Sequence, residues 1–283
     1  MFLANKTQSY GKLICDSYRS FKVLWTKLLP VYLIQVISIF GISVLILDKS
    51  TINIYIQAWQ SAQNSAVTDF MTISESDQAT MLNTINFMIN SILCAYFFIV
   101  QLCRADGALT SDITKIAGSW MTGLKRLLPV IAYVIALTLA YGIVVYGIFL
   151  LSKLTNMVGP WASFALYVGA FILGVYVTIR LFYGYMLLAS RQHGILSAIK
   201  TSWHLSKNYI WKIIFALILV ISIPNIAFSL LRMGLVNIIP TISHAEFTMS
   251  IILTLLQNFV MLTLVMGMGY VFLNDSIHRK ANK

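Results

Sequence analysis

The chain has 283 residues, of which 59% are hydrophobic and only 10% are charged. A soluble domain carries roughly 25% charged residues, so this composition, with a mean hydropathy of +0.82, excludes an ordinary soluble protein. The formal net charge of +11 would suit a nucleic-acid-binding protein. We attribute that charge to membrane topology instead and expect no nucleic-acid partner.

Six apolar runs without aspartate or glutamate are long enough to cross a bilayer as helices, which takes about 20 residues. They cover residues 28–47, 82–102, 127–151, 161–188, 213–236 and 247–273. The first run follows five basic residues and no small-residue cleavage site comes after it, so we expect it to stay as an anchor. The sequence therefore predicts an all-α, polytopic membrane protein with six transmembrane helices.

The basic residues predict the orientation. With the N-terminus in the cytoplasm, 17 of the 20 lysines and arginines fall in cytoplasmic segments, and only Lys49, Lys153 and Arg232 fall outside. Cytoplasmic segments of membrane proteins carry such an excess of basic residues. We predict a multi-pass protein of a bacterial inner membrane with both termini in the cytoplasm.

A twelve-residue phrase occurs twice, as SFKVLWTKLLPV at 20–31 and as SWMTGLKRLLPV at 119–130, and a weaker third copy lies within 194–213. Each belongs to a lead segment with apolar residues three and four positions apart, which predicts an amphipathic helix in the membrane interface. The chain thus reads as a single membrane domain, 1–283, made of three parallel helical-hairpin repeats. These units cover about 1–102, 103–190 and 191–283.

Each lead is expected to turn into its span at the end of the phrase. Pro30 and Pro129 would then lie in the first turn of a helix, where a missing N–H has little effect. In the first outer loop, apolar spacing over residues 52–70 predicts one more surface helix.

Aromatic and basic residues gather in and beside the leads, and we interpret them as an interface that binds membrane lipids, anionic ones included. The candidates are Lys22, Trp25, Trp120, Lys125, Arg126, Arg180, Trp203, Lys207 and Trp211. In the alternative interpretation the basic residues only set the orientation, and Arg180 only extends its head to the membrane face.

Uncharged polar residues within the apolar runs form a second candidate set. They would either bond neighbouring helices or line a polar cavity, with a kink at Pro224 that frees the carbonyl of Val220. They are Asn83, Asn86, Asn90, Asn225, Gln257 and Asn258.

Motifs for catalysis or metal binding are missing from the sequence. The four histidines have no metal-ligand spacing, and all nine acids and four histidines lie outside the apolar runs, which weighs against proton coupling. The three cysteines are expected to be free thiols. We predict no enzyme activity, no cofactor and no metal.

Residues 178–213 carry a pattern of an arginine near the end of a span, a small-residue turn, Ser-aromatic-x-Leu and a Lys–Asn–aromatic–x–Trp entry to the next span. Its members are Arg180, Gly194, Ser202, Trp203, Leu205, Lys207, Asn208, Tyr209 and Trp211. This stretch resembles the YciC-like family of uncharacterised bacterial inner-membrane proteins. It is also similar to the membrane domain attached to some glycerophosphodiester phosphodiesterases, whose catalytic domain these 283 residues lack.

Three functions stay open at this point. The first is a non-enzymatic membrane protein that binds or organises lipid or scaffolds partners. The second is a transporter or channel for a lipid-like or other small solute. The third is an assembly factor that acts with a partner protein. A homo-oligomer is compatible with each of them.

Overall fold

The structure, a computed structural model, describes residues 8–46, 77–155, 160–190, 193–207, 209–238 and 243–281, and these are helical apart from short turns. The helices are α1 (Tyr10–Ile46), α3 (Asp77–Thr110), α4 (Ile113–Ala117), α5 (Ser119–Thr155), α6 (Pro160–Ser190), α7 (Ile195–Ser206), α8 (Ile210–Ile238) and α9 (Ser243–Ala281). The predicted all-α class is confirmed. The surface helix expected over 52–70 lies outside the described residues.

Six of the helices, namely α1, α3, α5, α6, α8 and α9, are long and apolar enough to cross a membrane. Each contains one of the six predicted runs within the described part of the chain. The prediction of six candidate spans is therefore confirmed, and the chain is consistent with an integral multi-pass membrane protein.

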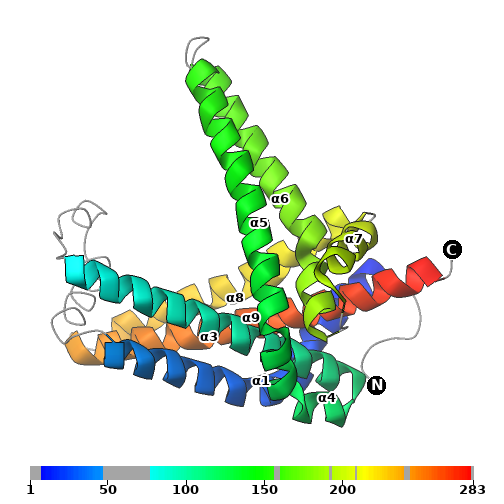
Figure 1. Ribbon diagram of the computed structural model, residues 1–283. Coiled ribbons are helices and arrows are strands. Elements are labelled where there is room, and N and C mark those ends of the chain that lie inside the picture. Colours follow the sequence, from blue (N-terminus) through cyan, green and yellow to red (C-terminus); the bar gives the residue numbers. More distant parts are fainter. Residues whose placement is uncertain are drawn as a thin grey trace.

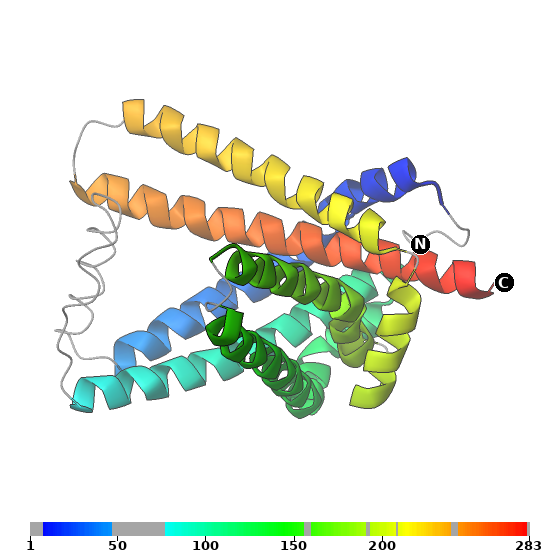
Figure 2. The same cartoon turned by 90° about the horizontal axis from the view of Figure 1, so that it is seen from above.

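The spans pair into three antiparallel hairpins, α1–α3, α5–α6 and α8–α9. Further packing of α3 on α5 and of α9 on α1 links the hairpins, and α6 and α7 also contact α9. The α5–α6 hairpin stands away from the other two (Figure 1), and the view from above shows α1 beside α3 and α8 beside α9 (Figure 2). The first and last described residues, Gln8 and Ala281, lie at the same end of the bundle.

The hydrophobic core lies mainly at that end, which we call the basal end and define as residues 8–28, 99–130, 179–213 and 264–281. Fully buried side chains there include Leu24, Ile99, Tyr183 and Phe272. The opposite, distal halves of the helices expose large apolar side chains. Soluble monomers rarely expose apolar surface on this scale, whereas lipid tails would cover it.

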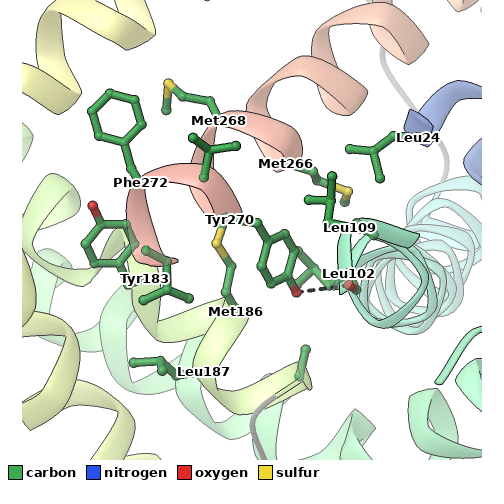
Figure 3. Close-up of a cluster of buried hydrophobic side chains, with 14 of the residues drawn as sticks. Leu24, Leu102, Leu109, Tyr183, Met186, Leu187, Met266, Met268, Tyr270 and Phe272 are labelled. Carbon is green, nitrogen blue, oxygen red and sulfur yellow. Dashed lines mark hydrogen bonds between the residues drawn. The ribbon is translucent and has the colours of Figure 1, made fainter. Parts of the chain in front are cut away.

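The basal part of α9 lies at the centre of this core (Figure 3). The Tyr270 hydroxyl donates a 2.9 Å hydrogen bond to the carbonyl of Leu102 in α3, and Met186 of α6 lies beside it. Two glycines let the neighbours approach, because a Cβ at Gly267 would collide with Ser20 of α1 and one at Gly269 with Met186. Helix α9 thus joins α1, α3 and α6.

The predicted bend between the first lead and its span is wrong, because residues 10–46 form a single helix. Pro30 and Pro129 lie in helix interiors and not in first turns. Membrane helices tolerate an interior proline where neighbouring groups compensate for the lost hydrogen bond. The second lead is interrupted at Gly118, and only the third contains a separate surface helix of several turns, α7.

The serines that open the three phrases, Ser20, Ser119 and Ser202, are all fully buried. Ser119 accepts a hydrogen bond from α3, Ser202 donates one to α6, and Ser20 packs against Gly267 of α9. Each serine therefore lies against the helix that returns to the basal end in the preceding hairpin, with α9 taking that place for the first. The repeat stays a prediction, and this shared environment favours it.

We predict that Gly184→Ala destabilises the protein while Gly169→Ala in the same helix does not. An added Cβ at Gly184 would collide with the hydroxyl of buried Tyr133, and this hydroxyl donates a 3.1 Å hydrogen bond to the carbonyl of Leu181. Overpacking of this kind costs about 1–3 kcal/mol. Gly169 has open space around it, so alanine there should be neutral or stabilise by up to about 1 kcal/mol. Thermal unfolding in detergent checks both variants, and equal midpoints would contradict the packing.

Candidate functional site

Basic side chains gather at the basal end. Of the lysines and arginines whose side chains are described, only Arg232 lies in a distal half. The thirteen basal ones are Lys12, Arg19, Lys22, Lys27, Arg104, Lys115, Lys125, Arg126, Arg180, Lys200, Lys207, Lys212 and Arg279. The described carboxylates there are Asp16, Asp106, Asp112 and Asp275. Positive charge therefore dominates this end of an apolar bundle.

Three of these carboxylates form ion pairs, Asp16 with Arg19 at 3.6 Å, Asp106 with Lys115 at 2.7 Å and Asp275 with Arg279 at 2.8 Å. Asp112 caps α4 instead. A hydrogen bond from the Thr114 hydroxyl, and then those from backbone amides, hold the pKa of Asp112 below its usual range. Ten basal cations are left without a carboxylate partner within the described residues.

Asp275 is the centre of a buried polar network near the end of α9. Its side chain is 2% exposed. It accepts hydrogen bonds from the backbone N–H of Gln8 at 2.8 Å, the Tyr209 hydroxyl at 2.6 Å and Arg279 Nε at 2.8 Å. Burial, and then the bond to Asp275, raise the pKa of Tyr209 above its ordinary value. The network ties the start of α1 and the α7–α8 turn to α9.

The sequence did not predict this network, because the last apolar run ends at residue 273 and Asp275 was interpreted as a loop charge. The signal was the spacing of Asp275 and Arg279, four residues apart, which suits a helical ion pair. Asp106, also taken as a loop charge, is likewise fully buried inside α3.

Arg104 of α3 lies where α1, α3 and α5 meet. Its Nε donates to Ser119 Oγ at 3.0 Å, its Nη1 lies 3.4 Å from the carbonyl of Lys27, and its guanidinium carbon is 5.2 Å from the Trp120 ring centroid. Trp120 is fixed by the rings of Tyr96 and Phe97. Arg104 was counted in the sequence only as a topological charge.

Arg180 of α6 has a similar partner set but is only 6% exposed. It lies 5.1 Å from the ring centroids of both Tyr176 and Trp203, and its Nη1 donates to the Trp203 carbonyl at 3.0 Å. Ser202 donates to the Arg180 carbonyl at 2.8 Å. In both the second and the third phrase, an arginine of the preceding long helix thus contacts the Ser–Trp pair.

The other predicted interface residues lie on the basal surface. Lys22, Lys125 and Lys207 are exposed, while Arg126 and Trp120 are half-buried. Trp25 and Trp203 are 43% exposed and Trp211 is 73% exposed. On α7 the buried face consists of Ala198, Ser202, Leu205 and Ser206. The exposed face of α7 combines Leu196 and Trp203 with Lys200, His204 and the following Lys207.

The predicted polar residues fall into two separate hydrogen-bonded groups. Between α1 and α3, Asn90 Nδ2 donates to Ser43 and to Asn86 at 3.0 Å each, and Gln101 donates to Gln35 at 2.9 Å. Sequence analysis missed Gln35, Ser43 and Gln101, although Gln101 continues the helical spacing of the asparagines.

Between α8 and α9, Gln257 donates to Asn225, and Arg232 donates to Thr254 at 2.8 Å and to Gln257 at 3.3 Å. Asn258 is exposed, and the side chain of Asn83 lies outside those described. Pro224 lies inside α8, as expected. The described contacts do not join the two groups into one seam.

Within the described residues, no group of three or more His, Cys, Asp and Glu is placed to hold a metal ion. Comparisons of the chain with models of protein families, with curated proteins and with solved structures find no match. The site is therefore interpreted from its own chemistry.

We predict that Asp275→Asn lowers stability far more than Asp16→Asn. The first change removes the charge that Arg279 and Tyr209 share in a buried site, which costs about 1–3 kcal/mol for poorly satisfied partners. Arg19, the partner of Asp16, is largely exposed, and such pairs contribute about 0–1 kcal/mol. Unfolding by SDS, followed by circular dichroism, checks the order, and equal losses would contradict the network's role.

Proposed function

We propose that the protein is a non-enzymatic integral membrane protein of the bacterial inner membrane whose basal end faces the cytoplasm and binds anionic phospholipid. We place it with the YciC-like proteins on the pattern at residues 178–213. The observation that carries the proposal is the set of ten basal cations that have no carboxylate partner among the described residues, at one end of a bundle with an apolar exterior.

The chemistry of that end fits a membrane interface. A lysine or arginine near an anionic leaflet contributes about 1 kcal/mol, and tryptophan prefers the headgroup level. The exposed face of α7 offers both, with Leu196 and Trp203 beside Lys200 and Lys207. Trp25 and Lys22 supply the same combination on α1.

Transport of a lipid-like solute is a second candidate, favoured by the polar contacts between α1 and α3. From Gln101 to Asn86 they extend over fifteen residues of α3, or about 22 Å at 1.5 Å per residue. That length is most of the ~30 Å apolar core of a bilayer. The polar residues form two separate groups, one between α1 and α3 and one between α8 and α9. A transported solute would therefore have to pass along the α1–α3 group, which is the longer stretch.

Neutralising one exposed lysine in each unit tests the lipid-binding proposal. The triple variant Lys22→Gln, Lys125→Gln, Lys207→Gln should lose affinity for nanodisc phosphatidylglycerol, and the salt dependence of binding should weaken, because fewer charges are left to screen. At about 1 kcal/mol per residue, the loss is about a hundredfold. Retained lipid is counted by native mass spectrometry.

The control is Lys153→Gln, which removes a positive charge near the distal end of α5 and should leave retention unchanged. If the triple variant keeps the affinity and salt dependence of the parent, the basic residues only set orientation. The transport candidate would then gain.

A further inference from the structure

Arg104 differs from the other arginine that lies over a tryptophan in one respect. Arg180 is enclosed, and Tyr176 and Trp203 accept hydrogen bonds from its Nε, Nη1 and Nη2. Arg104 is half-buried, and its Nη2 donates to none of the described residues. One arm of its guanidinium fork is therefore held in place and still open.

The charge of Arg104 is also unbalanced. The ion pairs within the described part of the chain use Arg19, Lys115 and Arg279, and the partners of Arg104 are a neutral hydroxyl, a carbonyl and an indole face. An arginine stays charged in proteins, so a half-buried one at a membrane boundary favours an anion beside it.

The position of Arg104 along α3 indicates which anion lies nearby. It follows the apolar run 82–102 by two residues, where α3 leaves the bilayer core and phosphate groups begin. Exposed Lys27 of α1 lies at the same junction, where its carbonyl meets Arg104 Nη1 at 3.4 Å. A planar guanidinium fork matches the two non-ester oxygens of a phosphodiester.

From this arrangement we propose that Arg104 anchors the phosphate of one phospholipid, with its Nη2 arm directed at the phosphodiester and its plane held by Trp120 and Ser119. The proposal rests on the lipid-binding function above and names the group in the ligand that is recognised. Arg104 would contribute tight binding of one lipid molecule, whereas the exposed lysines contribute the general attraction to an anionic leaflet.

Native mass spectrometry of the full chain, titrated with phosphatidylglycerol and separately with phosphatidylcholine, tests this. Arg104→Gln should weaken the first bound molecule of either lipid by roughly tenfold or more, because both carry the phosphodiester. Arg104→Lys should bind the first lipid molecule with an affinity between those of the parent and Arg104→Gln, because lysine keeps the charge but lacks the planar guanidinium fork. The matched control Lys125→Gln should weaken phosphatidylglycerol binding by about fivefold, at about 1 kcal/mol for one lysine, and should leave phosphatidylcholine binding unchanged.

Two further arms keep the outcome decisive. Phenylglyoxal modifies arginine, and in the unaltered protein phosphatidylglycerol should protect Arg104 more than Arg126, which answers the question even if Arg104→Gln fails to fold. Millimolar inorganic phosphate should not displace the lipid, and displacement would overturn the lipid assignment in favour of a free-phosphate site.

The two proposals fail differently. If the parent protein retains no phospholipid, both are wrong. If the parent and Arg104→Gln retain phosphatidylglycerol and phosphatidylcholine equally and Arg104 is unprotected, only the anchor is wrong. Lipid binding by the lysines would then still stand on the triple variant.

Discussion

The burial of the basal part of α9 is the constraint on which the rest of the structure depends. Residues 266–273 are all buried, and this segment contacts α1 through Gly267, α6 through Gly269 and α3 through the Tyr270 hydroxyl. Two residues further along α9, Asp275 holds the start of α1 and the α7–α8 turn. Because one segment of α9 contacts helices of the other two hairpins, the basal ends of the three hairpins are fixed relative to one another.

Among the described residues the distal halves form no comparable core, and their large apolar side chains face outward. In a bilayer this exterior needs no protein partner, since lipid tails solvate it. Polar contacts such as Asn90 with Ser43 and Gln257 with Asn225 hold the α1–α3 and α8–α9 hairpins together at that level. The division explains why chemistry concentrates at the basal end, where charges, aromatics and packing coincide.

The two arginines over tryptophans show how one local arrangement can serve two purposes. Arg180 is enclosed by aromatic rings and joins α7 to α6. Arg104 joins α5 and α1 to α3 and keeps one arm of its guanidinium open. Arg104 could therefore bind a lipid phosphate through its Nη2 without any change in its contacts with Ser119 and Lys27.

Apolar run length was enough to predict the six long helices, because a bilayer imposes a minimum span that composition alone reveals. Helix ends were harder to predict. Apolar runs stopped at residues 102 and 273, while α3 and α9 continue to Thr110 and Ala281 and bury Asp106 and Asp275. Those acids were read as loop charges because their partners, Lys115, Tyr209 and Gln8, come from other segments of the chain.

Only some residues of the candidate site could be predicted, because local spacing is visible in the sequence and contacts between distant segments are not. Spacing identified exposed Lys22, Lys125 and Lys207 and the Trp120 and Trp203 positions, since amphipathic periodicity is local. Arg104 was missed because its role depends on its contacts with Ser119 and Trp120, and the turn at Gly118 is what brings these two residues beside it. The polar residues were grouped together although α1–α3 and α8–α9 each satisfy their own.

The most direct test of the account is the side of the membrane on which the basal end lies, because anionic lipid recognition there requires the cytoplasmic leaflet. Cys15 is an exposed native thiol on basal α1, and Trp161, 82% exposed at the start of α6, marks the distal end. In intact cells, a membrane-impermeant maleimide should label Trp161→Cys in a Cys15→Ser background and should label Cys15 only after permeabilisation. Labelling of Cys15 in intact cells, with Trp161→Cys protected, would place the basic end outside and contradict the account.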